Sequence, residues 1–194
     1  MSPEKRYQTP SQTVGPDFAY GLTPEQYRYD FPSMADGNLI TNEQVNGERI
    51  TLAGQVWDGN GNLIPDAMIE IWQADADGQY AKDPRHFRGF GRFGTGTLKE
   101  AKFEFRTIKP GSVEGQAPHV NVILFMRGLL VHAYTRLYFS DEGEANAHDP
   151  VLQRVEEERR STLIASRTTR PDGTTCYTFP IYLQRSKETV FFDV

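Results

Sequence analysis

The stretch RITLAGQVWDGNGNLIPDAMIEIWQAD, residues 49–75, predicts the fold of this chain. It contains two runs of β-branched and aromatic residues separated by Asp-Gly-Asn-Gly-Asn at 58–62, which is a strong turn signal. In the second run, every second residue from Ala67 to Ile71 is apolar and falls on one face of a strand. This pattern indicates half-buried strands joined by a turn.

Similar runs occupy most of the chain beyond this stretch. Two long strands are predicted on either side of Gly128, and a late hairpin is predicted around Pro-Asp-Gly at 171–173. One helix is expected over 149–160, with Asp149 as its cap, whereas the glycine-rich stretch 75–102 is expected to form loops. The two strands around Gly128 are expected at 118–127 and 129–139, and those of the late hairpin at 161–169 and 175–184. Two further strands are predicted at 101–108 and 188–194. Many short strands and few short helices predict a mainly β protein, an antiparallel-rich β-sandwich whose site is built from loops.

Residues 1–48 differ from the remainder of the chain. They are rich in Pro, Gly, Asn, Gln and Tyr and show little apolar periodicity. Only Thr-Pro-Glu-Gln-Tyr at 23–27 suggests a helical turn, which Thr23 could cap. We therefore divide the chain into an N-terminal arm, residues 1–48, and a sandwich, residues 49–194. A long arm without a core of its own is expected to pack on its own domain or on a partner chain.

Composition excludes several classes of protein. The net charge of −5 argues against nucleic acid as the main partner. The single cysteine, Cys176, cannot form an internal disulfide or a cysteine-based zinc site. The first residues lack the apolar core of a signal peptide, and no apolar run is long enough to span a membrane. A cytoplasmic location is the resulting expectation.

Few residues suggest chemistry by themselves. There are four histidines, at 86, 119, 132 and 148, and the one at 148 is expected to be solvated. His119 and Asn121 would share one face of a strand, but an amide oxygen is a poor ligand for zinc or a trivalent ion. His119 and His132, on consecutive strands, could meet across the sheet or could be ordinary structural histidines.

Two other features are equally open. Arg127 ends a strand, where a guanidinium can bind a carboxylate bidentately or can simply be solvated. Gly15-Pro16 is either a rigid turn with exposed backbone or a simple kink in the arm. The sequence contains no phosphate-binding loop, dinucleotide fingerprint or serine-hydrolase motif. The residues alone lead no further than a β-sandwich with a long arm.

Several separated motifs together resemble the intradiol ring-cleaving dioxygenases over nearly the whole chain. In order, they are TPSQTVGP at 9–16, GQVWDGNGNLIPDAMIEIWQADADGQY at 54–80, FRTIKPG at 105–111, APHVNVILFMRG at 117–128, TRLYF at 135–139 and ETVFFDV at 188–194. The resemblance implies a sandwich of mixed sheets and a non-haem ferric iron held by two tyrosines and two histidines. It also implies that O2 attacks an iron-bound catecholate, so that protocatechuate opens between its hydroxyls to 3-carboxy-cis,cis-muconate in the beta-ketoadipate pathway of aromatic catabolism.

The four ligand positions that the resemblance implies are Tyr80, Val113, His119 and Asn121. Two of them lack the tyrosine or histidine that the family uses, and Gln116 stands where the family has a helper arginine. We therefore expect no metal and no catalytic residue in this chain. The departure resembles the iron-free alpha chain of the family's alpha–beta members, in which the beta chain binds Fe(III).

In such an alpha chain, the resemblance implies that Gly15, Pro16 and Arg127 help to wall the substrate pocket of the partner beta chain. Two other functions stay open at this point. One is a homomeric catechol-type dioxygenase, against which Val113 and Asn121 argue. The other is a non-enzymatic sandwich that binds a ligand or partner, against which the length of the resemblance argues. Iron analysis and copurification with a ring-cleaving chain would separate them.

Overall fold

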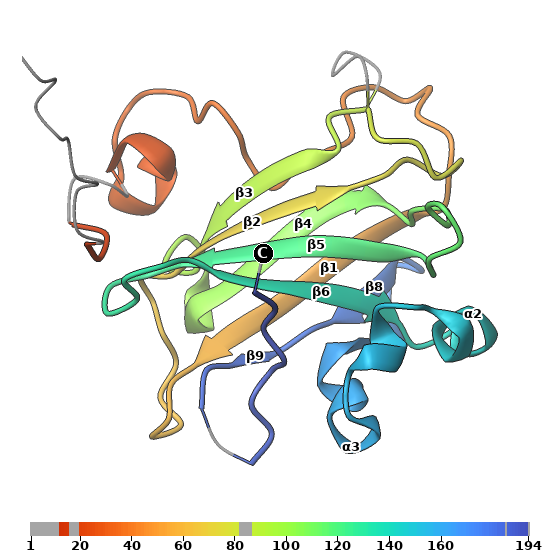
Figure 1. The fold of residues 1–194 in the computed structure, drawn as a ribbon. Coiled ribbons are helices and arrows are strands. Elements are labelled where there is room, and N and C mark those ends of the chain that lie inside the picture. Colours follow the sequence, from red (N-terminus) through yellow and green to blue (C-terminus); the bar gives the residue numbers. More distant parts are fainter. Residues whose placement is uncertain (1–11, 16–19, 82–86, 185, 194) are drawn as a thin grey trace, which may run out of the picture.

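The structure is a computed structural model that describes residues 12–15, 20–81, 87–184 and 186–193. In this part of the chain, nine strands form one mixed sheet in the order β3-β2-β5-β6-β7-β8-β1-β4, with β9 paired to β1 (Figure 1). The strands are β1 Arg49–Trp57, β2 Met68–Gln73, β3 Phe90–Gly94, β4 Lys102–Ile108, β5 His119–Phe125, β6 Ala133–Phe139, β7 Ile164–Thr169, β8 Thr175–Thr178 and β9 Ile181–Tyr182.

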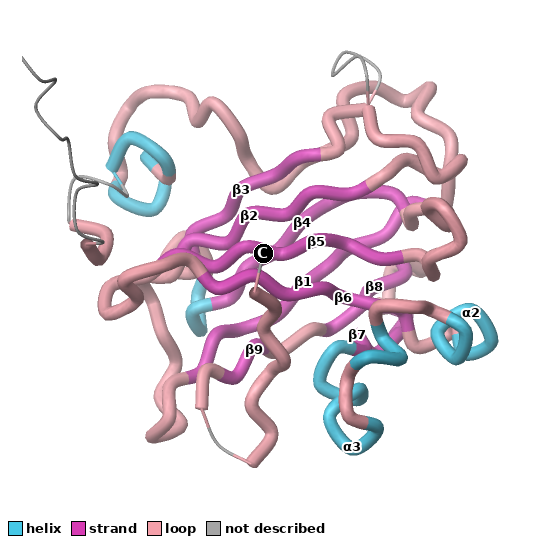
Figure 2. The backbone as a smooth tube through the Cα atoms, viewed as in Figure 1, coloured by secondary structure: helices cyan, strands magenta, loops and turns pink. Residues whose placement is uncertain are grey.

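The sheet folds over into two facing layers. Strands β3, β2, β5 and β6 form the layer at the front of Figure 2, and β4, β1 and β8 lie behind it. The layers are continuous through a short parallel pairing of β6 with β7, which joins Tyr138 to Ile164 and Phe139 to Ala165. Fully buried residues of both layers, such as Ile69 and Phe105, meet in one hydrophobic core. The predicted β-sandwich is confirmed, and its pairings are mixed.

Part of the N-terminal arm closes one side of the sandwich. The Arg92 amide of β3 donates to the carbonyl of Asp36, and the Arg106 amide of β4 donates to the carbonyl of Gly37. Leu39 is fully buried in the core. Residues 36–39 therefore join the two edge strands. The predicted turn at 24–27 is a 3-10 helix, Pro24–Tyr27, but Thr23 makes no side-chain cap to it.

The predicted turn at 58–62 is confirmed, since the Asp58 carboxylate accepts backbone hydrogen bonds from Asn60 and Asn62. The strands on either side of it, β1 and β2, pair with other strands and lie in different layers. The predicted strands around Gly128 are β5 and β6, which pair antiparallel, and the late hairpin is β7 and β8.

Three predictions are wrong. The stretch 75–102 is not only loops, because it contains β3. The strand pattern is interrupted there by Gly91. Packing requires this glycine, because a Cβ would lie 2.5 Å from the Leu39 side chain. In the described part of the stretch 188–194, residues 188–193, there is no regular strand, and the pairing is an isolated bridge of Phe192 with Tyr134 of β6.

The third error is the single helix over 149–160. The structure has a 3-10 turn, Leu152–Arg154, then extended backbone, then a short helix α3, Glu157–Arg160. The helix is interrupted because Leu152 and Val155 are buried in a small second hydrophobic core. Local helix propensity does not predict this tertiary packing. The other helical pieces are α2 Gly143–His148, η2 Lys99–Ala101 and η4 Ser161–Leu163. His148 at the end of α2 is exposed, as expected.

Among the described residues, no helix is both long enough and apolar enough to cross a membrane.

A charged cluster ties β4, β6 and β8 together at one end of the sandwich. Lys109 forms ion pairs with Asp141, at 2.9 Å, and with Glu142, and its ammonium lies over the Tyr177 ring. The Tyr177 hydroxyl donates to Asp141. Burial raises the pKa of Asp141, but hydrogen bonds from Lys109 and Tyr177 outweigh it and hold the pKa below its usual value.

We predict that Lys109→Met lowers the free energy of unfolding by about 1–3 kcal/mol at pH 7, because two partly buried carboxylates lose a charged donor. A depressed carboxyl pKa adds stability above the unfolded value of about 4, and this stability is lost as the pH falls through the folded pKa. The difference from wild type should therefore shrink below about pH 4. Denaturant unfolding at pH 7 and pH 3 measures it.

The matched control is Lys102→Met, because the Lys102–Glu100 ion pair is half exposed on both sides. Lys102→Met should lower the free energy of unfolding by less than about 0.5 kcal/mol. Equal costs for the two variants, or a Lys109→Met cost that does not change with pH, would contradict the assigned role of the cluster.

Candidate functional site

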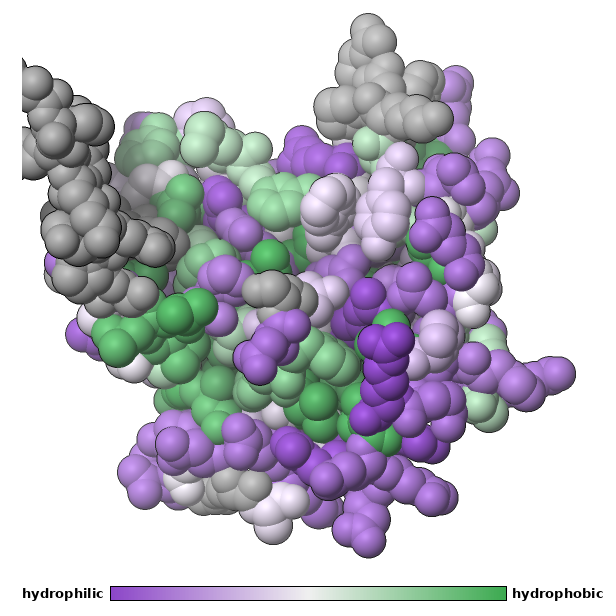
Figure 3. All heavy atoms as spheres, in the orientation of Figure 1, coloured by the Kyte–Doolittle hydropathy of each residue, from purple (hydrophilic) through white to green (hydrophobic). Residues whose placement is uncertain are grey.

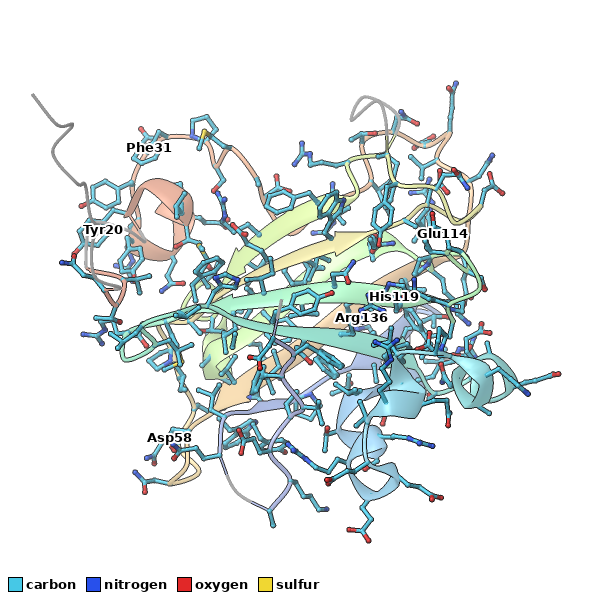
Figure 4. All side chains as sticks on the ribbon, in the orientation of Figure 1. Tyr20, Phe31, Asp58, Glu114, His119 and Arg136 are labelled. Carbon is cyan, nitrogen blue, oxygen red and sulfur yellow. The ribbon has the colours of Figure 1, made fainter. Side chains whose placement is uncertain are left out.

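The four family ligand positions lie on the outer face of the front layer and in the loops beside it. His119 and Asn121 are the first and third residues of β5. Tyr80 forms an isolated bridge with Ala74 just beyond β2, and Val113 lies in a tight turn before β5. In Figure 4, His119 and Arg136 lie side by side on β5 and β6, with Glu114 of that turn nearby. The structure thus brings the four positions to one end of β5.

Asn121 uses its whole side chain in hydrogen bonds. Its amide nitrogen donates to the Trp72 carbonyl at 3.2 Å and to the Tyr80 hydroxyl at 3.1 Å. Its amide oxygen accepts a hydrogen bond from the Tyr134 hydroxyl. The Asn121 oxygen is therefore engaged, and the Tyr80 oxygen has a donor directed at it.

Arg136 lies directly across from Asn121 in the β5–β6 register. Its Nη1 donates to the Gln116 side-chain oxygen at 2.6 Å, and its Nε donates to the Tyr134 hydroxyl at 3.3 Å. We call Arg136, Gln116, Tyr134, Asn121 and Tyr80 the Arg136 network. Gln116 stands where the family has a helper arginine. Here an arginine does lie beside position 116, but it is supplied by β6.

His119 is a buried histidine with a fixed ring. Its Nδ1 lies 2.8 Å from the Ala117 carbonyl, and its side chain is 3% exposed. Burial lowers the pKa of His119 below its ordinary value, and the nearby Arg136 charge acts in the same direction. The ring is therefore held neutral. His132, which could have met it across the sheet, lies outside β6 and contacts Phe125.

Asp149 is the residue that positions this end of β5. It is fully buried, and its carboxylate accepts hydrogen bonds from the Ala117 amide at 2.8 Å and from the Tyr138 hydroxyl at 3.1 Å. It also accepts from the amides of Val151 and Leu152, which is the capping role predicted for it. Its contact with the segment before His119 could not be predicted from sequence.

The second tyrosine position, residue 113, begins a tight turn. Val113 and Gln116 pair across a tight turn, with the Gln116 amide donating to the Val113 carbonyl at 2.8 Å. Glu114 and Gly115 between them both have positive φ, 48° and 79°. Val113 is 9% exposed and offers only hydrocarbon, so this position supplies no donor atom.

These residues do not fit a ferric ion. Members of the family use non-haem Fe(III), but here one ligand position is a valine and another is an amide engaged on both sides. A guanidinium beside them adds positive charge and no lone pair. In the described part of the chain, no group of three or more His, Cys, Asp and Glu side chains could hold a metal ion.

The residues expected to bind substrate lie at the other end of β5. The Thr13 hydroxyl accepts from the Gly128 amide at 2.8 Å, which places Thr13 of the arm beside Gly128, the residue that follows Arg127. No contact between Gly15 and Arg127 is seen among the described residues. Arg127 is 71% exposed and forms an ion pair with Asp66. Pro16 and His86 lie outside the described residues.

Tyr27 of the arm also belongs to this neighbourhood. Burial raises the pKa of Tyr27, the Asp66 charge acts in the same direction, and the Arg127 charge opposes them. A cavity of about 500 Å³ opens beside Arg127, lined in part by Tyr134, Leu183 and Phe191. The structure therefore brings the arm and Arg127 together, although 113 residues separate Thr13 from Met126.

The two ends of β5 are far apart. Six residues separate Asn121 from Arg127, which at about 3.3 Å per residue corresponds to about 20 Å between their Cα atoms. Figure 4 shows Arg136 and His119 at one side of the molecule and Tyr20 and Phe31 of the arm at the other. Arg127 and the ligand positions therefore belong to opposite ends of β5.

Comparison with known proteins gives the family. A family model described as Dioxygenase matches residues 22–185. The chain is 49% identical to the protocatechuate 3,4-dioxygenase alpha chain of Burkholderia cepacia, over 96% of this chain and 98% of that one. It is 44% identical to the alpha chain of Pseudomonas putida, over 96% of both chains.

More distant similarities agree with this assignment. The beta chain of the Burkholderia cepacia enzyme is 33% identical over 66% of this chain and 60% of its own length. Among solved structures, a dioxygenase domain from Streptomyces sp. SirexAA-E has a TM-score of 0.59 at 22% identity, covering 94% of this chain and all of its own. An intradiol ring-cleavage dioxygenase from Tetranychus urticae has a TM-score of 0.58 at 21% identity, with 86% and 94% covered. The resemblance predicted from sequence is thus confirmed, and this chain belongs to the dioxygenase family.

Proposed function

We propose that this chain is the iron-free alpha subunit of a protocatechuate 3,4-dioxygenase, and that a partner beta chain holds the Fe(III) and carries out ring cleavage. The observation that carries the proposal is the full-length similarity to two alpha chains. The geometry supports it, because Val113 and the fully engaged Asn121 leave the ligand positions without donors for iron.

The second part of the proposal is a role for Arg127, Gly15 and Pro16 in the partner's substrate pocket. An exposed guanidinium can bind the carboxylate of protocatechuate, the group that distinguishes this substrate from catechol. Arg127 lies about 20 Å from the ligand positions of its own chain, so a substrate carboxylate near it would belong to another site. The hydrogen bond from the Gly128 amide to the Thr13 hydroxyl supports a surface shared by the arm and Arg127.

The third part is that the N-terminal arm, residues 1–48, packs on the partner chain. Tyr29, Phe31 and Met34 of the arm are 47%, 47% and 81% exposed, and Leu130 and Val131 beside Arg127 are each 63% exposed. In Figure 3, hydrophobic residues gather where Figure 1 places the β5–β6 connection. Apolar surface of this kind is typical of a protein interface.

The first prediction concerns metal content. The purified chain alone should bind far less than one iron ion and should cleave no protocatechuate, because two ligand positions lack donors. The chain coexpressed with its beta partner should copurify with about one iron ion per alpha–beta pair and show tyrosinate-to-iron absorption. Metal analysis and ring-cleavage assays measure both. A burgundy, active lone chain would refute the proposal.

The second prediction concerns Arg127. In the assembled enzyme, Arg127→Ala should lower kcat/KM for protocatechuate about ten- to a hundredfold, since a charge-assisted contact contributes about 1.5–3 kcal/mol. Catechol, which lacks the carboxylate, should be affected much less, and iron content should not change. The matched control is Arg167→Ala, another exposed, ion-paired arginine, which pairs with Glu48 and Asp141.

Equal losses on both substrates would mean that Arg127 acts through gating or general structure, and no loss on either would remove it from the pocket. Arg167→Ala should leave both activities unchanged, which separates a local role of Arg127 from a general effect of removing surface charge.

The third prediction concerns assembly. The double variant Leu130→Asp/Val131→Asp should fail to copurify with the beta chain, because stable obligate interfaces bury about 2,000 Å² or more of largely apolar surface. Leu98→Asp, a change at another exposed leucine, is the control and should assemble normally. Size-exclusion chromatography of coexpressed chains measures both. Normal assembly of the double variant would place the interface elsewhere.

A further inference from the structure

Arg136 is a half-buried cation without an acidic partner among the described residues. The ion pairs found in that part of the chain involve Arg88, Arg92, Arg127, Arg167, Arg170 and two lysines, but not Arg136. Its contacts are neutral oxygens instead, those of Gln116, Tyr134 and Tyr138. A partly desolvated guanidinium with only neutral acceptors calls for an explanation.

The Arg136 network reaches the family ligand positions. Through the Gln116 side chain, Arg136 is linked to the turn that contains Val113. Through the Tyr134 hydroxyl it is linked to Asn121, and through Asn121 to Tyr80. It also lies close enough to His119 to lower the pKa of that ring, in addition to the larger effect of burial.

The segments that the network connects are distant in sequence. They are the connection after β2, the turn before β5 and β5 itself, which carry the four ligand positions, together with β6, which carries Tyr134 and Arg136. In a metal centre, the ion would connect the first three of these segments. Here the Arg136 guanidinium connects β6 to the turn directly, through Gln116, and reaches β5 and the connection after β2 through Tyr134 and Asn121. A Lys ammonium could not reproduce the planar geometry of its five donors.

We propose that Arg136 is a built-in cation that takes the structural place of the metal: it cross-links the segments of the former ligand set and excludes metal cations from them. This inference rests on the proposed function, which assigns iron to the partner chain. It goes beyond it by attributing the lack of metal to a residue that is present as well as to ligands that are lost.

The physical argument has two parts. A guanidinium stays protonated at any pH at which the protein is folded, so it repels a second cation close by. In the wild-type chain its network also engages one ligand oxygen, because Asn121 donates to the Tyr80 hydroxyl. Asn121→His removes that hydrogen bond, so in the restored site the charge of Arg136 is what opposes a metal ion. Restoring the missing ligands alone should therefore fail to restore the metal site.

The experiment compares full-length variants. The double variant Val113→Tyr/Asn121→His restores the ligand types, and the triple variant adds Arg136→Gln, which removes the charge. A second triple variant with Arg136→Lys keeps the positive charge but loses the planar guanidinium with its five donors. Each is expressed without the beta chain in iron-supplemented medium and assayed for iron per chain and for tyrosinate-to-iron absorption. Circular dichroism verifies that each is folded.

The triple variant with Arg136→Gln should hold at least tenfold more iron than the double variant, and the variant with Arg136→Lys should resemble the double. Equal iron in the double and the Arg136→Gln triple variant, whether high or low, would overturn the inference. Iron in the wild-type chain would instead overturn the proposed function, so the two failures are distinguishable.

A second measurement tests the cross-link without any metal. Arg136→Gln in the otherwise wild-type chain should lower the thermal unfolding midpoint by several degrees, since the turn before β5 and the Tyr134 hydroxyl lose their charged donor. Arg106→Gln is the control, because Arg106 is an exposed arginine at a strand centre in the other layer. Equal thermal unfolding midpoints for the two variants would contradict the cross-linking role of Arg136.

Discussion

The register between β5 and β6 is the constraint on which the rest of the structure depends. It sets His119 opposite Tyr138 and Asn121 opposite Arg136. The same register places Val120, Val122 and Leu124 in the core, so a shift of one residue would expose the core of the front layer. The positions of the Arg136 network are therefore fixed by hydrophobic burial on the other face of the strand.

Strand β5 separates two surfaces with different chemistry. At its start, the buried Asp149 carboxylate anchors the backbone before His119, and the Arg136 network fills the space between the surrounding segments. At its end, Arg127 and Thr13 of the arm lie at an exposed, partly apolar surface. The first surface is internally satisfied, whereas the second has a cation and apolar side chains open to a partner. This asymmetry is what a non-catalytic subunit that contributes to its partner's site would need.

The arm has two physical roles within one segment. Residues 36–39 are part of the sandwich, since they hydrogen-bond to both edge strands and supply Leu39 to the core. Tyr29, Phe31 and Met34 remain exposed. Closing the edges in this way also protects β3 and β4 from pairing with other chains. The division into arm and sandwich at residue 48 stays a prediction, but the sandwich itself depends on part of the arm.

The sequence by itself determined the strands, their alternation and the turns, because these follow from local periodicity and from residues such as Gly128 and Asp58. Through the resemblance, it also pointed to Val113 and Asn121 at positions where the family uses a tyrosine and a histidine. It did not reveal β3, in which Gly91 is required by the packing of Leu39, or the break in the helix after Asp149. Above all, it gave no sign of Arg136 or of the contact between Thr13 and Gly128. Those contacts join residues far apart in the chain, and only the folded sandwich, through strand register and burial, brings them together.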